Sequence, residues 1–143
     1  MSDLSRQVER HKALGHPARL RILAMLREGP LCACQITAVL GLAASTVSAH
    51  LAELRRAGLL EEKKEGRWVE FRLAADAETE RQLATLWPVL ERDRAIAADA
   101  ALTRRLRRVE LEILCRADLD LVKLGLRRKK EAAGPRTRRS EAG

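Results

Sequence analysis

The spacing of apolar residues changes at Gly58, and this change limits the fold more than any other feature. Before it, apolar side chains recur every three or four positions, as on one face of a helix. From Leu59 the period becomes two, in two arms at 60–64 and 67–73 that flank Glu65 and Gly66. Two such arms around a glycine-containing turn predict a β-hairpin. Helical spacing resumes after Asp76.

Breaks at residues 15–17, 29–30 and 41–43 divide the stretch before the hairpin into four helical segments. The first covers about 4–14, and the second runs from Pro17, which suits a first helical turn, to about Arg27. A short helix follows at about 32–40, and Gly41 suits its C-terminal cap. Another helix covers about 45–57. Two helices joined by so tight a turn predict a helix-turn-helix.

Composition favours helices for the rest of the chain. Its 143 residues include no Tyr, one Phe and two Trp, so Leu, Ala, Val and Ile must build the core, as in packed helices. A helix is expected over about 95–116, and Pro88 is expected to interrupt the helical stretch before it. We expect a mainly α fold with a β-hairpin wing: a winged helix-turn-helix, dimeric through its terminal helices.

Three segments follow from these patterns. Residues 1–95 are expected to form the DNA-binding and dimerisation domain, and residues 96–126 a C-terminal helical extension. Residues 127–143, with seven basic and two acidic side chains, are expected to form a basic, disordered tail. Such a tail either strengthens contact with phosphates or serves only as a solubilising terminus.

Several classes of protein are disfavoured. No apolar run approaches the roughly 20 residues that span a bilayer, and a signal-peptide stretch is lacking, so we expect a cytoplasmic protein without membrane contact. Reducing cytosol would keep the three cysteines as thiols. The His and Cys residues form no nucleophile–base signature and no glycine-rich phosphate loop is present, so neither an enzyme nor an organic cofactor is expected.

The second helix of the helix-turn-helix and the hairpin carry the side chains expected to contact double-stranded operator DNA. Residues near the start of that helix would face base edges in the major groove, while hairpin cations would approach the minor groove or backbone. Ser45 is equally suited to capping the helix, and His50 to packing locally. The candidates are Ser45, Thr46, Ser48, Ala49, His50, Arg55, Lys63, Lys64 and Arg67.

Cys32 and Cys34 lie at the expected first turn of the short helix. Side chains at i and i+2 point about 200° apart on a helix, so one ion takes both sulfurs only if the turn unwinds. The helix dipole is expected to lower the thiol pKa there. Thiolates select soft ions. Two sulfurs with a third match three-coordinate As(III) or Sb(III) better than tetrahedral zinc. Cys115 is the remaining thiol, a candidate third ligand from the same or the partner chain, unless it only packs beside Leu114.

These features together resemble the ArsR/SmtB family of bacterial metal-responsive repressors, over about residues 10–95. The resemblance rests on residues 14–23, 31–35 and 45–51 and on the hairpin from 58 to 73. It implies an arsenic-sensing homodimer, with a role in arsenical resistance, that occupies an operator without metal and leaves it when metal binds. The chain has Pro30 and Gln35 where the family's metal box usually has Glu and Asp. It has Thr37 where some arsenic-responsive relatives place a third Cys.

Other functions stay open beside arsenic sensing. A disulfide or polysulfide link from Cys32 or Cys34 to Cys115 would make the chain a thiol-redox sensor. Another soft metal, cadmium or lead, would suit the same fold. A constitutive architectural DNA binder with inert thiols is the third alternative.

Overall fold

The computed structural model describes residues 2–128, and these contain eight helices and three strands. Part of the expected basic tail, residues 129–143, lies outside the described residues. The helices are α1 (Asp3–Leu14), α2 (Pro17–Leu26), α3 (Ala33–Leu40), α4 (Ala44–Arg56), α5 (Ala77–Ala84), α6 (Trp87–Leu90), α7 (Arg94–Leu106) and α8 (Leu111–Arg116). The strands are β1 (Leu31–Cys32), β2 (Leu60–Glu65) and β3 (Trp68–Leu73).

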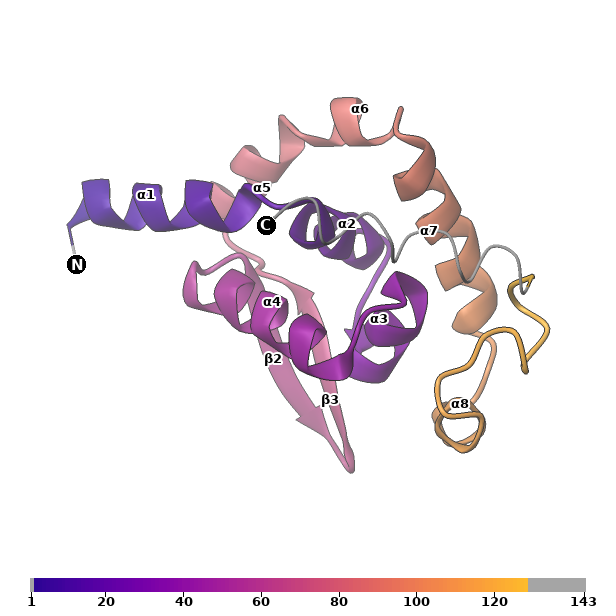
Figure 1. Ribbon diagram of the computed structural model, residues 1–143. Helices are drawn as coiled ribbons and strands as arrows, with labels where there is room; N and C mark the ends of the chain where they lie inside the picture. The colour runs from indigo at the N-terminus through magenta and orange to yellow at the C-terminus, as the bar shows by residue number, and fades with distance from the viewer. Residues whose placement is uncertain (1, 129–143) are drawn as a thin grey trace.

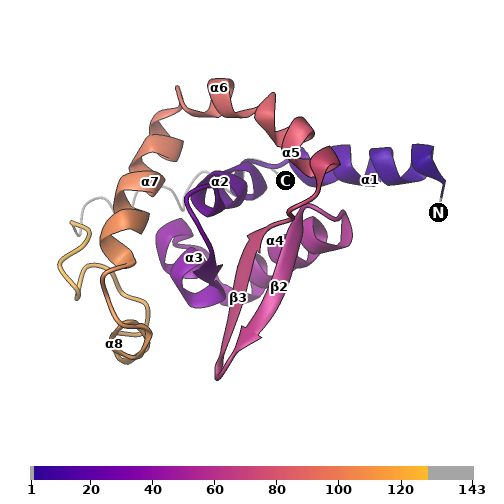
Figure 2. The ribbon, with the colours of Figure 1, turned by 180° about the vertical axis from the view of Figure 1, so that it is seen from behind.

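The predicted hairpin is confirmed and forms the wing. Strands β2 and β3 pair antiparallel from Leu60 opposite Leu73 to Glu65 opposite Trp68, and they project from the helical body (Figures 1 and 2). Gly66 makes the turn with a φ of 59°, a left-handed conformation that glycine adopts without penalty. The short strand β1, which the apolar pattern did not predict, adds to the other edge of β3 and gives the order β1-β3-β2.

The C-terminal helices differ from the expectation. The helix expected over 95–116 is interrupted, because α7 ends at Leu106 and α8 begins at Leu111. Arg107 sits at this end, and its guanidinium donates hydrogen bonds to the carbonyls of Gly29 and Pro30 at 2.8 and 2.6 Å. The break lets α8 turn back against α3 and bury Leu114. Near Pro88 the expected interruption is confirmed: α5 ends before it, and Pro88 lies in the first turn of α6.

The extension contributes directly to the core. Helix α7 packs along α2 and α3, and the fully buried Leu106 and Leu114 join side chains of α2, α3 and α4. Arg21 of α2 donates two hydrogen bonds to Asp99 of α7, Nε to Oδ2 at 2.7 Å and Nη2 to Oδ1 at 2.8 Å. Asp99 is 4% exposed, so this ion pair lies inside the α2–α7 contact.

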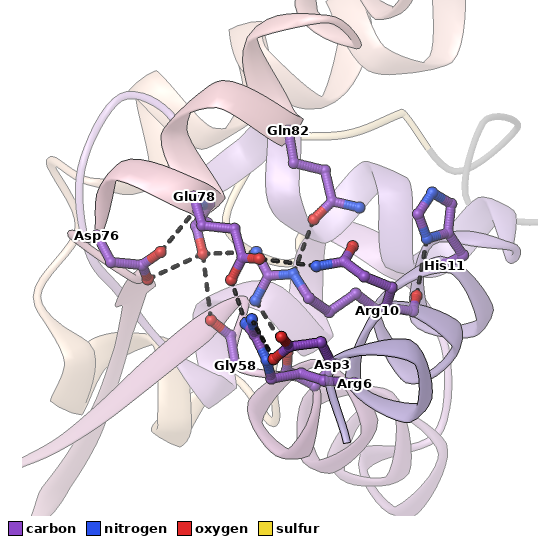
Figure 3. Close-up of polar contacts among 11 residues, drawn as sticks. Asp3, Arg6, Arg10, His11, Gly58, Asp76, Glu78 and Gln82 are labelled. Carbon is purple, nitrogen blue, oxygen red and sulfur yellow. Dashed lines mark hydrogen bonds and ion pairs between the residues drawn. The ribbon is translucent and has the colours of Figure 1, made fainter. Parts of the chain in front are cut away.

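Helix α1 is held to the body by a buried arginine (Figure 3). Arg10, only 3% exposed, donates to the side chains of Gln82 and Thr79 at 2.8 and 2.7 Å and to the carbonyl of Ala57 at 3.1 Å. A buried guanidinium needs such partners. Asp76 also accepts hydrogen bonds from the backbone N–H and the hydroxyl of Thr79. These contacts join α1 to the end of α4 and to α5.

No single helix within residues 2–128 is long and apolar enough to cross a membrane. The α3–α4 pair meets that test of length and composition only when both helices are counted together across their bend of 116°.

Candidate nucleic-acid interface and thiol site

Helices α3 and α4 meet as the two helices of a helix-turn-helix do. Gly41 ends α3 with a φ of 68°, and its N–H donates to the carbonyl of Thr37 at 3.0 Å. Helix α4 begins at Ala44, and the two helices are bent by 116°, within the range of about 90–120° for such units. The helix-turn-helix expected from the glycine breaks is therefore present.

The start of α4 presents a polar surface. Ser45, Ser48 and Ala49 are exposed and Thr46 is half-buried, whereas the opposite face of the helix is buried. The N-cap position is occupied by Ala43, so Ser45 is not the capping residue. Hydroxyls and backbone N–H groups are therefore presented at the helix end that would approach DNA.

His50 occupies a different position from the other α4 candidates. Its ring lies against the ring of His16, with centroids 4.4 Å apart, and Arg19 Nη1 donates to its Nδ1 at 3.3 Å. Burial lowers the pKa of both histidines, and the neighbouring Arg19 lowers both further. The packing favours a structural role for His50 at the contact between α2 and α4.

Most of the cationic side chains that are expected to contact DNA form ion pairs with acidic side chains. Arg55 pairs with Glu62 at 3.6 Å, and Lys63 pairs with Glu65 at 3.0 Å. Arg67, in the turn of the wing, pairs at 2.5 Å with Glu112 of α8. Lys64 is exposed and has no ion pair within residues 2–128.

Cys32 lies where strand β1 becomes helix α3. It is opposite Glu70 in the sheet, and its extended backbone makes it the N-cap of α3. The expected position in the first turn of the helix is therefore wrong for Cys32. Its N–H donates to the side-chain oxygen of Gln35 at 2.8 Å. Pairing with β3 is the reason for the difference, because it holds the backbone extended. Cys34 follows inside the first turn and is half-buried.

The expected lowering of the thiol pKa by the helix dipole is wrong. Burial raises the pKa of Cys34 to about 11, and it also raises the pKa of Cys32. The charges of Glu70 and Cys115 act in the same direction on Cys32. Removal of the thiols from water therefore outweighs the dipole, and both thiols are protonated at neutral pH.

Cys115 lies on α8, which packs against α3. It is exposed, and it is close enough to Cys32 and Cys34 for its charge to raise the pKa of both. Within residues 2–128, however, no three His, Cys, Asp or Glu side chains are gathered closely enough to hold a metal ion. The fold thus brings the three thiols into one neighbourhood of a single protomer without assembling a finished ion site.

Two residues next to the thiols were missed by the sequence patterns. Glu70 lies across the sheet from Cys32, and Arg107 binds the carbonyls of Gly29 and Pro30, just before β1. The alternation of the hairpin would have placed Glu70 if the pairing of β1 had been known. Arg107 belongs to a run of arginines with no distinguishing spacing, so no local signal identifies it.

Residues 16–62 match the sequence model of the family described as "Bacterial regulatory protein, arsR family". The chain is 44% identical over 63 residues to the arsenic resistance transcriptional regulator ArsR1 of Pseudomonas putida, covering 43% of this chain and 49% of that one. It is 40% identical over 68 residues to the arsenical resistance operon repressor of Escherichia coli, covering 47% and 58%. The chain thus spans about half the length of these two relatives. It spans 86% of the regulator MJ1325 of Methanocaldococcus jannaschii, at 38% identity over 53% of this chain.

Two solved structures of similar fold agree with these sequence matches. HlyU from Vibrio cholerae superposes with a TM-score of 0.56 at 33% identity, covering 62% of this chain and 97% of HlyU. The homodimeric winged helix-turn-helix DNA-binding domain Mb0332 of Mycobacterium bovis gives a TM-score of 0.56 at 30% identity, covering 64% and 88%. These comparisons bear out the winged helix-turn-helix fold. The relatives from Pseudomonas putida, Escherichia coli and Methanocaldococcus jannaschii are named as regulators of transcription or repressors rather than enzymes.

Proposed function

Because the chain belongs to the arsR family of bacterial regulatory proteins, we propose that it is a repressor that binds operator DNA as a homodimer and leaves it on binding As(III) or Sb(III). The ligands in this proposal are Cys32, Cys34 and Cys115. The observation that carries it is the packing of α8 on α3, which brings Cys115 near the other two thiols of the same protomer.

The DNA-binding half of the proposal rests on α4 and the wing. A dimer would place two α4 helices in successive major grooves, about 34 Å apart, on an imperfect inverted repeat. Leu4 and Val8 of α1 and Val89 of α6 are large apolar side chains left exposed, at 76%, 43% and 64%. These exposed apolar side chains support a dimer interface that includes α1 and α6, and the homodimeric Mb0332 domain is a structural neighbour.

Trivalent arsenic suits thiols that are buried and protonated. Arsenous acid condenses with three thiols, each As–OH leaving as water, so As(OH)₃ and three RSH give As(SR)₃ and three H₂O with no net release of protons. A divalent ion must displace three protons and leaves a net negative charge at the site, which burial disfavours. The chemistry of the donors therefore favours a neutral metalloid over cadmium or lead.

Binding would reach the DNA-reading helix through the start of α3. Cys32 is in extended backbone and Cys34 in helix, so gathering both sulfurs around one atom must distort the junction that Gln35 now caps. Helix α3 packs directly on α4. A coupling of about 1–3 kcal/mol per site would lower operator affinity roughly 5–150-fold.

The closeness of Cys115 also favours a second candidate, a thiol-redox repressor. Two thiols would give up two electrons and two protons to a peroxide or polysulfide and form a disulfide between Cys115 and Cys32 or Cys34. Reductant, rather than a chelator, would reverse this response.

Fluorescence anisotropy of reduced protein on a labelled duplex from the region upstream of its own gene tests these proposals. Arsenite, antimonite, cadmium, zinc and a polysulfide are each added to wild type, Cys32→Ser, Cys34→Ser and Cys115→Ser. We expect arsenite to release wild type, and release to be lost in the first two variants and weakened in Cys115→Ser. All four proteins should bind the duplex equally without additions. Binding indifferent to every addition would leave a constitutive DNA-binding protein, and release by polysulfide alone would favour the redox sensor.

A further inference from the structure

The parts of the chain that would read DNA carry almost no net charge. The wing, residues 60–73, has four acidic and four basic side chains, and α4 has one acidic and two basic. Affinity for duplex DNA comes largely from cations that neutralise phosphates. An almost neutral reading surface therefore needs phosphate-binding cations from elsewhere.

The cations of the wing are also already paired. Lys63 pairs with Glu65, Arg72 with Glu61, and Arg67 with Glu112. Within residues 2–128, Lys64 is the only wing cation without an ion pair. Each paired cation would have to exchange a carboxylate for a phosphate, so its net contribution to DNA affinity is reduced.

The end of α7 and helix α8 carry an excess of positive charge. Residues 104–116 hold five basic and two acidic side chains. Arg108, just after α7, and Arg116, at the end of α8, are both exposed. Their guanidinium groups make no ion pair or hydrogen bond in the part of the chain that the structure describes.

Helix α8 of the extension lies beside the wing. The contact between Arg67 and Glu112 joins the turn of the wing to α8 at 2.5 Å. Arg116 is four residues beyond Glu112, so the two side chains share one face of α8. Figures 1 and 2 both show α8 at the same end of the molecule as the wing tip, with α6 at the opposite end.

We propose that residues 104–116, called here the basic arm, form a second DNA-contacting element in which Arg108 and Arg116 bind backbone phosphates beside the wing. The proposal rests on the proposed function in that the chain binds duplex DNA. The contacts are independent of base sequence, because a guanidinium on a phosphate positions a protein without reading bases. Pairing with Arg67 neutralises Glu112, which leaves Glu110 as the one carboxylate of residues 104–116 without an ion pair in the part of the chain that the structure describes.

The salt dependence of binding to a labelled 30-base-pair duplex of random sequence tests the arm. The double variant Arg108→Ser/Arg116→Ser is compared with Arg92→Ser/Arg94→Ser, which removes the same charge at the other end of α7, about 20 Å away along the helix. Each phosphate contact contributes about 0.9 to the slope of log K against log salt. The arm variant should therefore lose about 1.8 from the slope per protomer, or about 3.6 for the bound dimer, and affinity at 0.1 M salt should fall on the order of 60-fold for each protomer in contact.

Outcomes separate the arm from general charge. The control pair should leave the slope within about 0.3 of wild type, and both variants should match the circular dichroism and melting temperature of wild type. An unchanged slope in the arm variant, or an equal loss in both variants, overturns the proposal while DNA binding by α4 stands. Failure of wild type to bind the random duplex and the upstream duplex alike overturns the proposed function as well.

Discussion

The ion pair between Arg21 and Asp99 is expected to be the main electrostatic link between the winged helix-turn-helix and its extension. Both oxygens of Asp99 accept hydrogen bonds from the guanidinium, at 2.7 and 2.8 Å, and Asp99 is 4% exposed. The Asp99 carboxylate in turn raises the pKa of Arg21. The substitution Asp99→Asn removes the charge with little change in volume and leaves the guanidinium without its partner.

The magnitude follows from the burial of the two partners. Breaking a fully buried pair costs about 3–5 kcal/mol, because the remaining charge is stranded. The side chain of Arg21 keeps 24% of its surface exposed, so water would recover part of that loss. We expect a destabilisation of about 2 kcal/mol, or a fall of about 4–8 °C in melting temperature.

Urea denaturation followed by circular dichroism measures this cost, with Glu28→Gln as the matched control. Glu28 pairs with Arg104 at 2.6 Å and also joins the end of α2 to α7, but its side chain and that of Arg104 are 41% and 62% exposed. An exposed pair contributes at most about 1 kcal/mol. Equal, small losses in both variants would refute the reasoning from burial. Adding Arg21→Met to Asp99→Asn should restore part of the stability, because no charge is then stranded.

Two further predictions concern pH. Burial lowers the pKa of His16 and His50, so the unfolded chain binds protons at these two residues more readily than the folded chain. The stability that the two histidines contribute is therefore complete above about pH 6.5 and is lost as pH falls below that value. As pH falls from 7.5 to 5.5, the urea concentration at the unfolding midpoint should decrease for wild type and should change less for His50→Gln. Equal slopes of midpoint against pH in the two proteins would contradict this. Burial also raises the pKa of Cys32 and Cys34, so cadmium affinity should rise by up to about tenfold per pH unit for each proton displaced, whereas arsenite affinity should stay nearly flat. Competition titrations at pH 6, 7 and 8 measure this contrast, and parallel pH profiles for the two ions would count against condensation with neutral thiols.

Local patterns in the sequence are sufficient to predict the elements whose residues are close together in the chain. Apolar spacing and glycine breaks predict α2, α3, α4 and the hairpin to within about two residues, because periodicity reflects which face of an element is buried. The helix-turn-helix and the exposed Ser45 and Ser48 follow from the same local information. The resemblance to a family rests on those segments too.

Features that depend on residues distant in the sequence arise only when the chain has folded. Pairing of β1 with β3 draws Cys32 out of the helix, and burial reverses the expected direction of the thiol pKa. Arg107 ends α7 by binding carbonyls 77 and 78 residues away, and the return of α8 brings Cys115 to the other thiols and Glu112 to the wing. Local sequence patterns do not predict such contacts. The desolvation of a thiol and the distance between two side chains depend on which surfaces meet after the chain has folded.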